Sequence, residues 1–396
     1  MRCLQGQVVR TYAQPALPGE ATSVIREPSD AKSSGKTGHP RGLGPRAGSA
    51  RLSVIVPTLD AATYLPELLA SLAAQRQPAH EVIAIDGYST DATIAILESF
   101  TSRLPLRIEQ RPREGIYAAW NAGLELASND LCYVACADDL VYPDAFEVLA
   151  RMARVAPDVH LYTWPVRVID NSGKRVSESG SPIVRLVWRD WADRPHQRCG
   201  LGDAITTLAM GSPYLSMMGV AFSRELWQAT GGFSQEYGPA GDVEWQVRAA
   251  PLTDVAYYPR SLAAWRSHPS SATSMTSQRD DLDRWTRIIS AYLDGALEAT
   301  GLTPAARQAA RRRLLAIHRQ SRSLVLANRF ARHPDPGTLA LLIRLASPSA
   351  LATVLWLGVG RFVRSRRDSP ALAAPASALV SLLRDLDVPE PMPLPL

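Results

Sequence analysis

The fold is decided by residues 52–86, whose sequence is LSVIVPTLDAATYLPELLASLAAQRQPAHEVIAID. The apolar run at 52–56 ends at Pro57 and predicts a short buried strand. A second apolar run at 81–85 predicts another strand. Between the two runs, four leucines recur at the spacing of one helix face, namely Leu65, Leu68, Leu69 and Leu72. The stretch therefore predicts a strand, a helix and a second, parallel strand.

The alternation of strands and helices continues as far as residue 155. At about 25 to 30 residues per unit, this order predicts a parallel sheet flanked by helices. Beyond it, the apolar runs at 159–164 and 166–169 and the turn at 170–173 predict antiparallel strands, so we expect a mixed α/β fold. The other elements predicted in the parallel part are a helix after the cap residues 89–91, a strand at 106–109, a helix at 116–127, a strand at 131–136 and a helix at about 143–155.

The composition of the chain changes at two places, which we take as domain boundaries. Residues 1–50 are rich in Gly, Pro, Ser and Arg and show neither the helix nor the strand period, so we expect a disordered leader. The predicted α/β domain follows this leader. Residues 276–396 are arginine-rich and predicted to be a helical C-terminal extension.

The overall composition excludes several classes of protein. The chain has 396 residues, 46% of them apolar and 20% charged, which is too long for one small domain and too apolar for a disordered chain. Four cysteines without a CxxC pair argue against a disulfide scaffold and a zinc site, and favour a reducing compartment. We see neither a run of roughly 18 apolar residues nor a signal-peptide core, so we expect a cytoplasmic protein.

Polar side chains follow three of the predicted parallel strands. Thr58 and Asp60 come after the first strand, and Asp86 comes after the second. Asp138 and Asp139 follow the fourth. Because the carboxyl ends of parallel strands meet at one edge of a sheet, we expect these side chains to converge. Carboxylates suit Mg²⁺ or Mn²⁺, whose shell a substrate phosphate completes, so the pattern predicts a nucleoside diphosphate site.

A structural explanation competes with the functional one at each position. A single aspartate after a strand is more often a turn former or a helix cap, which better explains Asp60 and Asp91 taken alone. Asp138 and Asp139 are adjacent beside an apolar strand, and two such charges cost free energy without a counterion. For this pair the functional explanation leads.

Four motifs in register resemble glycosyltransferase family 2, whose fold is GT-A. They are SVIVPT at 53–58, IDGYSTDAT at 85–93, GIYAAWNAG at 115–123 and ADD at 137–139. The resemblance covers residues 51 to about 275. It implies a GT-A catalytic domain with a nucleotide-binding half at 51–140 and an acceptor half at 141–275, and a nucleotide-sugar donor.

The resemblance also assigns residues to the donor site. Thr58 and Asp60 match positions that contact the nucleoside, and Asp86 matches the position that holds the base or ribose. Asp138 matches the metal-binding position of the DxD motif, with Asp139 beside it to share the Mn²⁺ or Mg²⁺. Two positions depart from the family: Cys136 replaces the first acid of DxD, which weakens the metal site, and Tyr88 replaces a glycine or aspartate, which narrows the donor pocket.

On the acceptor side, GGFS at 231–234 and GDVEW at 241–245 resemble the segment that carries the catalytic base. The resemblance places the base at Asp242, which would take the proton of an acceptor hydroxyl. Glu244 offers the same chemistry, and on a helix only one of the two faces the cleft. A helix cap is the structural alternative for Asp242.

Other polar residues are candidates for contact with the diphosphate. Arg113 and Arg111 precede the glycine at the start of the third motif, and Arg266 and His268 lie late in the domain. Basic groups there would neutralise the leaving diphosphate. Asn121, on the helix of the same motif, fits a contact with the diphosphate or the acceptor. We take Arg113 and Asn121 as donor-binding residues.

The function that follows is transfer of a sugar from a nucleotide sugar, in particular a UDP-sugar, to a hydroxyl of a glycan or a lipid-linked saccharide. The family implies inversion at the anomeric carbon. A non-catalytic glycan-binding or scaffolding relative is an alternative, because of Cys136. A sugar-1-phosphate nucleotidyltransferase is less favoured, since the first strand is followed by PTLD at 57–60 and not by a glycine-rich basic loop.

The charge of the chain bears on its partners. The net charge of +5 suits nucleic acid, anionic lipid or phosphorylated substrates. Nucleic acid is not expected, because the candidate site is acidic. The apolar segment at 350–363, followed by the arginines of 364–367, favours peripheral contact with the inner face of a membrane, and packing of these helices on the core is an equal alternative.

Overall fold

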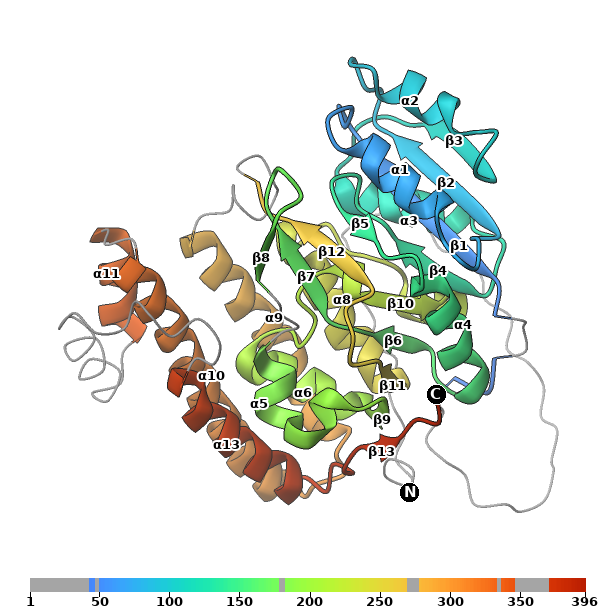
Figure 1. Ribbon diagram of the computed structural model, residues 1–396. Coiled ribbons are helices and arrows are strands. Elements are labelled where there is room, and N and C mark those ends of the chain that lie inside the picture. Colours follow the sequence, from blue (N-terminus) through green and yellow to red (C-terminus); the bar gives the residue numbers. More distant parts are fainter. Residues whose placement is uncertain (1–42, 47–49, 178–181, 269–277, 333–335, 346–369) are drawn as a thin grey trace, which may run out of the picture.

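The chain folds around two β-sheets, and helices cover both faces of the larger one (Figure 1). The computed structural model describes residues 43–46, 50–177, 182–268, 278–332, 336–345 and 370–396. Within these residues the larger sheet has nine strands. In spatial order they are β13 (Met392–Pro393), β9 (His196–Cys199), β11 (Asp254–Tyr257), β6 (Leu161–Thr163), β10 (Val220–Ser223), β4 (Leu131–Val134), β1 (Leu52–Thr58), β2 (Glu81–Asp86) and β3 (Leu106–Gln110).

The four strands predicted first form the parallel part of this sheet. β1 pairs in parallel with β2 and β4, and β2 pairs in parallel with β3. β10 runs antiparallel between β4 and β6, whereas β11 is parallel to β6. The strands β1, β2, β4, β6 and β11 therefore all end at one edge of the sheet. The predicted mixed, mostly parallel sheet is confirmed.

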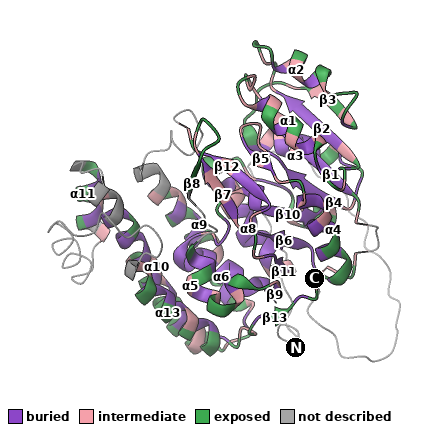
Figure 2. Cartoon of the chain, in the orientation of Figure 1, coloured by how far each residue is buried: buried purple, intermediate pink, exposed green. Residues whose placement is uncertain are grey.

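Two layers of helices cover the larger sheet. Alternate residues of a strand point to opposite faces, so Val54 and Val56 lie in one apolar cluster and Ile55 lies in the other. Figure 2 shows the buried strands between these layers. The helices of the first layer are α1 (Leu65–Ala73), α2 (Thr93–Ser99) and α4 (Ala145–Val155), and those of the second are α3 (Ile116–Leu126), α7 (Arg224–Thr230) and α8 (Gly241–Ala249). The four leucines predicted to form one face of α1 are all buried.

The smaller sheet contains one of the two strands predicted after residue 155. Its strands, in spatial order, are β5 (Leu140–Val141), β12 (Ala263–Arg266), β7 (Val166–Ile169) and β8 (Arg175–Ser177). The runs at 159–164 and 166–169 are predicted to be antiparallel strands, and each has an antiparallel partner: β6 pairs with β10 in the larger sheet, and β7 pairs within the smaller one. β7 pairs antiparallel with β8 across the predicted turn and parallel with β12. Apolar runs alone carry no information on which partner a strand selects.

The C-terminal extension is helical, as predicted, and it packs on the second half of the domain. Its helices share an apolar cluster with α5 (Pro182–Trp188), α6 (Gly200–Met210) and α8. They are α9 (Gln278–Glu298), α10 (Pro304–Arg332), α11 (Pro336–Leu345) and α13 (Pro370–Asp385), of which α9, α10 and α13 contribute to this cluster. The apolar and basic segment at 350–367 lies outside the described residues. Among the residues that are described, no helix combines the length and the apolar character needed to cross a membrane.

Two expectations from composition need revision. The predicted leader ends earlier than residue 50, because the backbone of Arg46 donates to Pro157 O at 2.9 Å and Gly44 O lies 2.8 Å from His160 Nε2. Residues 1–42 and 47–49 lie outside the described part. Among the cysteines, Cys132 and Cys136 are free, whereas Cys199 is disulfide-bonded. The cysteine pattern, which argued against a disulfide scaffold, did not predict this bond.

Candidate functional site

The carboxyl ends of β1 and β2 are joined through Asp86. Thr58 Oγ1 donates a hydrogen bond to Asp86 Oδ1 at 3.0 Å, and Gln110 Nε2 donates to Asp86 Oδ2 at 3.2 Å. The backbone N–H of Ser89 donates to the same Oδ2 at 2.9 Å. Asp86 is fully buried and Thr58 is buried beside it. The structure thus brings these two predicted donor-site residues together and uses the carboxylate of Asp86 to hold the loop after β2.

Asp60 connects the loops that follow β1 and β2. Its Oδ1 accepts from Thr90 N at 2.8 Å and from Thr90 Oγ1 at 3.1 Å, and its own N–H donates to Ser89 Oγ at 2.9 Å. Its backbone has a φ of 46°, a conformation that aspartate adopts more readily than most residues. Asp60 therefore has the turn-forming role expected of a single aspartate after a strand, and it remains exposed at the edge of the sheet.

Asp138 presents a carboxylate at the end of β4. Its side chain is 31% exposed, and its Oδ2 lies 2.8 Å from Nε2 of His268. The imidazole of His268 also lies against Tyr64, with the ring centroids 5.3 Å apart. Asp138 is thus an accessible acid, and its carboxylate contacts the imidazole of His268, which follows the last residue of β12 by two positions.

Asp139 lies in a different environment from its neighbour. It is buried, and its Oδ1 accepts from the backbone N–H of Arg266 at 2.7 Å. Burial, and then the charge of Asp138, raise the pKa of the Asp139 carboxyl well above its usual range. The prediction that Asp139 shares the metal is corrected here, because its carboxyl group is turned into the protein to hold β12.

Arg266 was a candidate for contact with the diphosphate, and the structure corrects this prediction. Its side chain is fully buried, with Nε donating to Asp138 O at 2.8 Å and Nη2 to Glu67 Oε2 at 2.9 Å. The guanidinium also lies 4.5 Å from the centre of the Tyr64 ring. A group with these partners is not available to a diphosphate, so Arg266 instead fixes the backbone that carries Asp138.

Cys136 lies where the two halves of the domain meet. Burial is the largest cause that raises the pKa of its thiol, followed by the charges of Asp139, Asp138 and Asp242. Asp138 follows β4 and Asp242 begins α8, so carboxylates from two distant parts of the chain contribute to the raised pKa of one thiol. A thiol held protonated is a poor ligand for a hard cation. In the described part of the chain, no group of three His, Cys, Asp or Glu side chains is arranged to hold a metal ion.

Asp242 lies in the first turn of α8 and is partly buried. Its Oδ1 accepts from Val243 N at 2.8 Å and from the hydroxyl of Tyr117 at 3.2 Å. Tyr117 Oη also lies 3.1 Å from Pro239 O, which it can donate to as an alternative. Burial raises the pKa of the Asp242 carboxyl to about 6. A carboxylate of this pKa is a stronger base than an ordinary aspartate and is still ionised at neutral pH.

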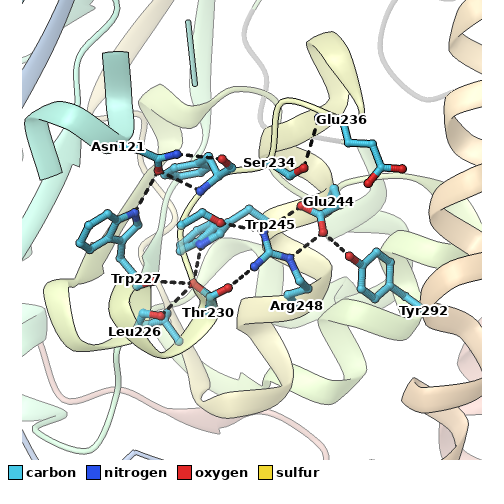
Figure 3. A network of polar contacts seen from close by, with 12 residues as sticks. Asn121, Leu226, Trp227, Thr230, Ser234, Glu236, Glu244, Trp245, Arg248 and Tyr292 are labelled. Atoms are coloured by element: carbon cyan, nitrogen blue, oxygen red, sulfur yellow. Dashed lines mark hydrogen bonds and ion pairs between the residues drawn. The ribbon is translucent and has the colours of Figure 1, made fainter. Parts of the chain in front are cut away.

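Glu244, the other candidate base, is buried, and its carboxylate is bonded to the side chains of Arg248 and Tyr292 (Figure 3). Arg248 donates to it through Nε at 2.6 Å and through Nη2 at 2.9 Å, and the hydroxyl of Tyr292 donates to the same carboxylate. The second of these arginine nitrogens also donates to Gly232 O at 2.7 Å. This buried network fastens α8 to α9 and leaves Asp242 as the available acid of the pair.

Asn121 has a structural role as well (Figure 3). Its Oδ1 accepts from Phe233 N at 2.9 Å and from Trp227 Nε1 at 3.2 Å, and its Nδ2 donates to Phe233 O at 2.8 Å. The predicted contact with the donor is corrected, because the amide is used to hold the GGFS segment at 231–234. Arg113, by contrast, is exposed in the loop before α3 and remains a candidate for the diphosphate.

Sequence reasoning missed Tyr117, which reaches Asp242 from the helix of the third motif. Tyr117 is buried, and its ring lies 4.9 Å from that of Trp120 and 6.1 Å from that of Phe233. Its position in the same motif as Asn121 was the available signal, but nothing local shows a partner that lies 125 positions further along the chain.

Known proteins resemble this chain in sequence. Residues 53–212 match the model of the family described as Glycosyl transferase family 2. A PGL/p-HBAD biosynthesis glycosyltransferase of Mycobacterium tuberculosis is 38% identical over 103 residues, which are 26% of this chain and 40% of that relative. The poly(ribitol-phosphate) beta-N-acetylglucosaminyltransferase TarS of Staphylococcus aureus is 35% identical over 133 residues, 33% of this chain and 23% of TarS. The chain thus matches less than half the length of either relative.

The fold is similar to that of solved glycosyltransferases. The crystal structure of S. aureus TarS 1-349 in complex with UDP-GlcNAc matches with a TM-score of 0.53 and 16% identity, covering 85% of this chain and 91% of that one. This likeness confirms the predicted GT-A architecture. All four motifs at the carboxyl edge of the sheet lie within residues 53–212, and this segment of the chain accordingly forms a glycosyl transferase family 2 domain.

Proposed function

We propose that the protein transfers a sugar from a nucleotide sugar to a hydroxyl group of a glycan or a lipid-linked saccharide. The observation that carries the proposal is the presence of two distinct acids, an accessible one after β4 and one with a raised pKa at the start of α8. Asp138 is accessible at the end of β4, on the donor side, and Asp242 has a raised pKa on the acceptor side. Both charges act on the one thiol. In the proposed reaction, Asp138 would bind the metal ion and Asp242 would take the proton of the acceptor hydroxyl.

A UDP-sugar is the donor that we favour. TarS, with which this chain shares 35% identity over 133 residues, is named as an N-acetylglucosaminyltransferase, and its solved complex contains UDP-GlcNAc. Thr58 and Asp60 lie in or beside the loops where the nucleoside would bind, and Asp86 holds the second loop in place. Arg113 is our candidate for the charge of the diphosphate, because it is an exposed cation ahead of α3.

A divalent cation fits this site only in part. Asp138 is a suitable ligand, since magnesium and manganese often bind through one carboxylate and take further oxygens from substrate phosphates and water. Cys136 and Asp139 are unsuitable, because the thiol is held protonated and the carboxyl of Asp139 is buried. Mn²⁺ or Mg²⁺ at Asp138 would offset the negative charge of the leaving diphosphate.

Asp242 is the base in this proposal. At pH 7 to 8 a carboxyl with a pKa of about 6 is ionised, and it can accept the proton of an acceptor hydroxyl as that oxygen attacks the anomeric carbon. The bond from the anomeric carbon to the diphosphate breaks as the new glycosidic bond forms. A single displacement of this kind inverts the anomeric centre.

The class of acceptor is inferred from the named relatives. One is a glycosyltransferase of PGL/p-HBAD biosynthesis and the other acts on poly(ribitol-phosphate), so related proteins act on different acceptors. We propose that the acceptor is a hydroxyl of a glycan or lipid-linked saccharide. The protein would act in the cytoplasm, at the inner face of the membrane. Contact with a membrane would be made by the C-terminal region, whose segment at 350–367 is apolar and then basic.

The test is a screen for nucleotide release. The purified full chain is incubated with a panel of nucleotide sugars and Mn²⁺. The nucleoside diphosphate that is released is measured with and without acceptor saccharides. We expect release with one donor class, and its loss in Asp138→Asn and Asp242→Asn. The control is Asp193→Asn, which removes an exposed carboxylate paired with Arg185. Equal release by all variants would refute the proposal, and donor binding without turnover would favour the non-catalytic glycan-binding alternative that Cys136 suggests.

A further inference from the structure

Tyr88 has an unfavourable backbone conformation and an exposed ring. It lies in the loop between β2 and α2, its φ is 58°, and 57% of its surface is exposed. A bulky residue rarely adopts this left-handed conformation, which glycine adopts without cost. The ring gains little burial in return. Folding alone therefore does not account for a tyrosine at this position.

The loop around Tyr88 is held from both sides. Before it, Asp86 is buried and accepts from the backbone N–H of Ser89. After it, Ser89 and Thr90 are hydrogen-bonded to Asp60 of the neighbouring loop. A left-handed residue persists where its surroundings determine the backbone in this way, and such residues cluster at ligand sites. The loop thus presents the Tyr88 ring to solvent in a fixed place.

The order of strands shows how far Tyr88 lies from Asp138, the proposed metal ligand. Asp138 follows β4, and Tyr88 follows β2, with β1 between them. Neighbouring strands are about 4.8 Å apart, so the ends of β4 and β2 are separated by about 10 Å. The sugar and the diphosphate belong beside Asp138 and Asp242. A nucleotide that extends from there along the edge of the sheet brings its base to the end of β2.

We propose that Tyr88 is a stacking surface for the base of the nucleotide donor. The inference rests on the proposed function and adds the residue that recognises the nucleoside end. The flat face of a base stacks on an aromatic ring, and this contact tolerates different bases. Tyr88 therefore contributes affinity for a nucleotide over a sugar phosphate that lacks a base, and Asp138 contributes at the other end.

The test compares binding of two probes by calorimetry with the full chain and Mn²⁺. The probes are UDP and ribose 5-diphosphate, which has the same charged group without the base. We expect Tyr88→Gly to weaken UDP binding by about 5- to 150-fold and to leave binding of ribose 5-diphosphate unchanged. Because glycine suits the local φ, the melting temperature should stay the same or rise.

Two further variants separate the ring from the backbone. Tyr88→Phe keeps the aromatic face and should bind UDP as the wild type does. Tyr88→Asn tolerates the left-handed conformation without an aromatic ring, and should weaken UDP binding as Tyr88→Gly does. The inference is overturned if Tyr88→Gly binds UDP as tightly as the wild type, or if both probes weaken equally. A wild-type protein that binds neither UDP nor other nucleotides would instead contradict the proposed function itself, and the stacking role with it.

Discussion

The hydroxyl of Tyr117 lies 3.2 Å from Oδ1 of Asp242 and joins the two halves of the domain at the proposed base. Tyr117 belongs to α3, which packs on β1 and β2, whereas Asp242 begins α8. A hydrogen bond donated to a carboxylate favours its ionised form and lowers its pKa. Burial acts in the opposite direction and is the larger effect, so the pKa of Asp242 remains above that of an ordinary aspartate.

Tyr117→Phe should therefore raise the pKa of Asp242 further. Because the base must be ionised to accept a proton, the acidic limb of the pH profile of kcat/KM should move to higher pH, by about 0.5 to 1 pH unit for one lost hydrogen bond. The measurement is kcat/KM between pH 5 and 9. Tyr133→Phe is the control, since Tyr133 is equally buried but donates to Met218 O. An acidic limb that stays in place in Tyr117→Phe would show that Asp242 is not the group that titrates.

Asp242→Asn should stabilise the protein while it abolishes activity. The folded pKa is raised from 3.8 to about 6, so the buried charge opposes folding above pH 6, and this cost disappears as the pH falls toward 4. At pH 8 the free energy of unfolding should rise by about 1 to 2 kcal/mol, after a discount because the side chain is only partly buried. At pH 4 the two proteins should be equally stable. Urea unfolding at both pH values is the check, and a variant that is less stable at pH 8 would contradict this account.

Glu244→Gln should instead destabilise the protein. The substitution leaves the guanidinium of Arg248 buried with a neutral partner, at a cost of about 3 kcal/mol. Glu236→Gln removes an exposed ion pair with Arg287 and should cost less than about 1 kcal/mol. Denaturant unfolding of the two variants measures the difference. Any activity that Glu244→Gln retains should have the wild-type pH profile, and a displaced acidic limb would make Glu244 the base.

Asp138→Asn and Asp139→Asn should differ although the residues are adjacent. Asp138→Asn removes an accessible carboxylate and should abolish the Mn²⁺ dependence of UDP binding. Asp139→Asn keeps an oxygen to accept from Arg266 N and should retain that dependence. Calorimetric titration of UDP with and without Mn²⁺ distinguishes the two. If Asp139→Asn alone loses the dependence, the metal assignment must move to Asp139.

The order of elements was predictable because each depends on a local pattern. The leucine face of α1 and the apolar runs of β1 and β2 contain the information for a parallel unit within 35 residues, and the structure agrees with them. The carboxyl-edge position of Thr58 and Asp86 follows from the same unit. The assignment of β6 to the larger sheet and β7 to the smaller one was not predictable. Two short apolar runs have no local feature that selects a sheet.

Individual roles within the site depended on distant partners. Asn121 and Asp139 have the residue types of binding groups, but Phe233 and Arg266 occupy their polar atoms from over 100 positions away. Asp242 and Glu244 are two positions apart, and their different partners distinguish them, since Glu244 is paired with Arg248 and Asp242 accepts from Tyr117. Composition and motif spacing cannot reveal which polar groups are already satisfied in the folded chain.

The pairing of β13 with β9 has a consequence for how the molecule is made. Met392 lies opposite Gln197, and Pro393 lies opposite His196, so the outer edge of the larger sheet is covered by residues near position 396. During synthesis, β9 leaves the ribosome long before its partner exists, and its unpaired backbone groups stay open to other chains. The nascent protein is therefore vulnerable to aggregation until residues 392–393 have been synthesised, and slow synthesis of the helical extension would prolong that interval.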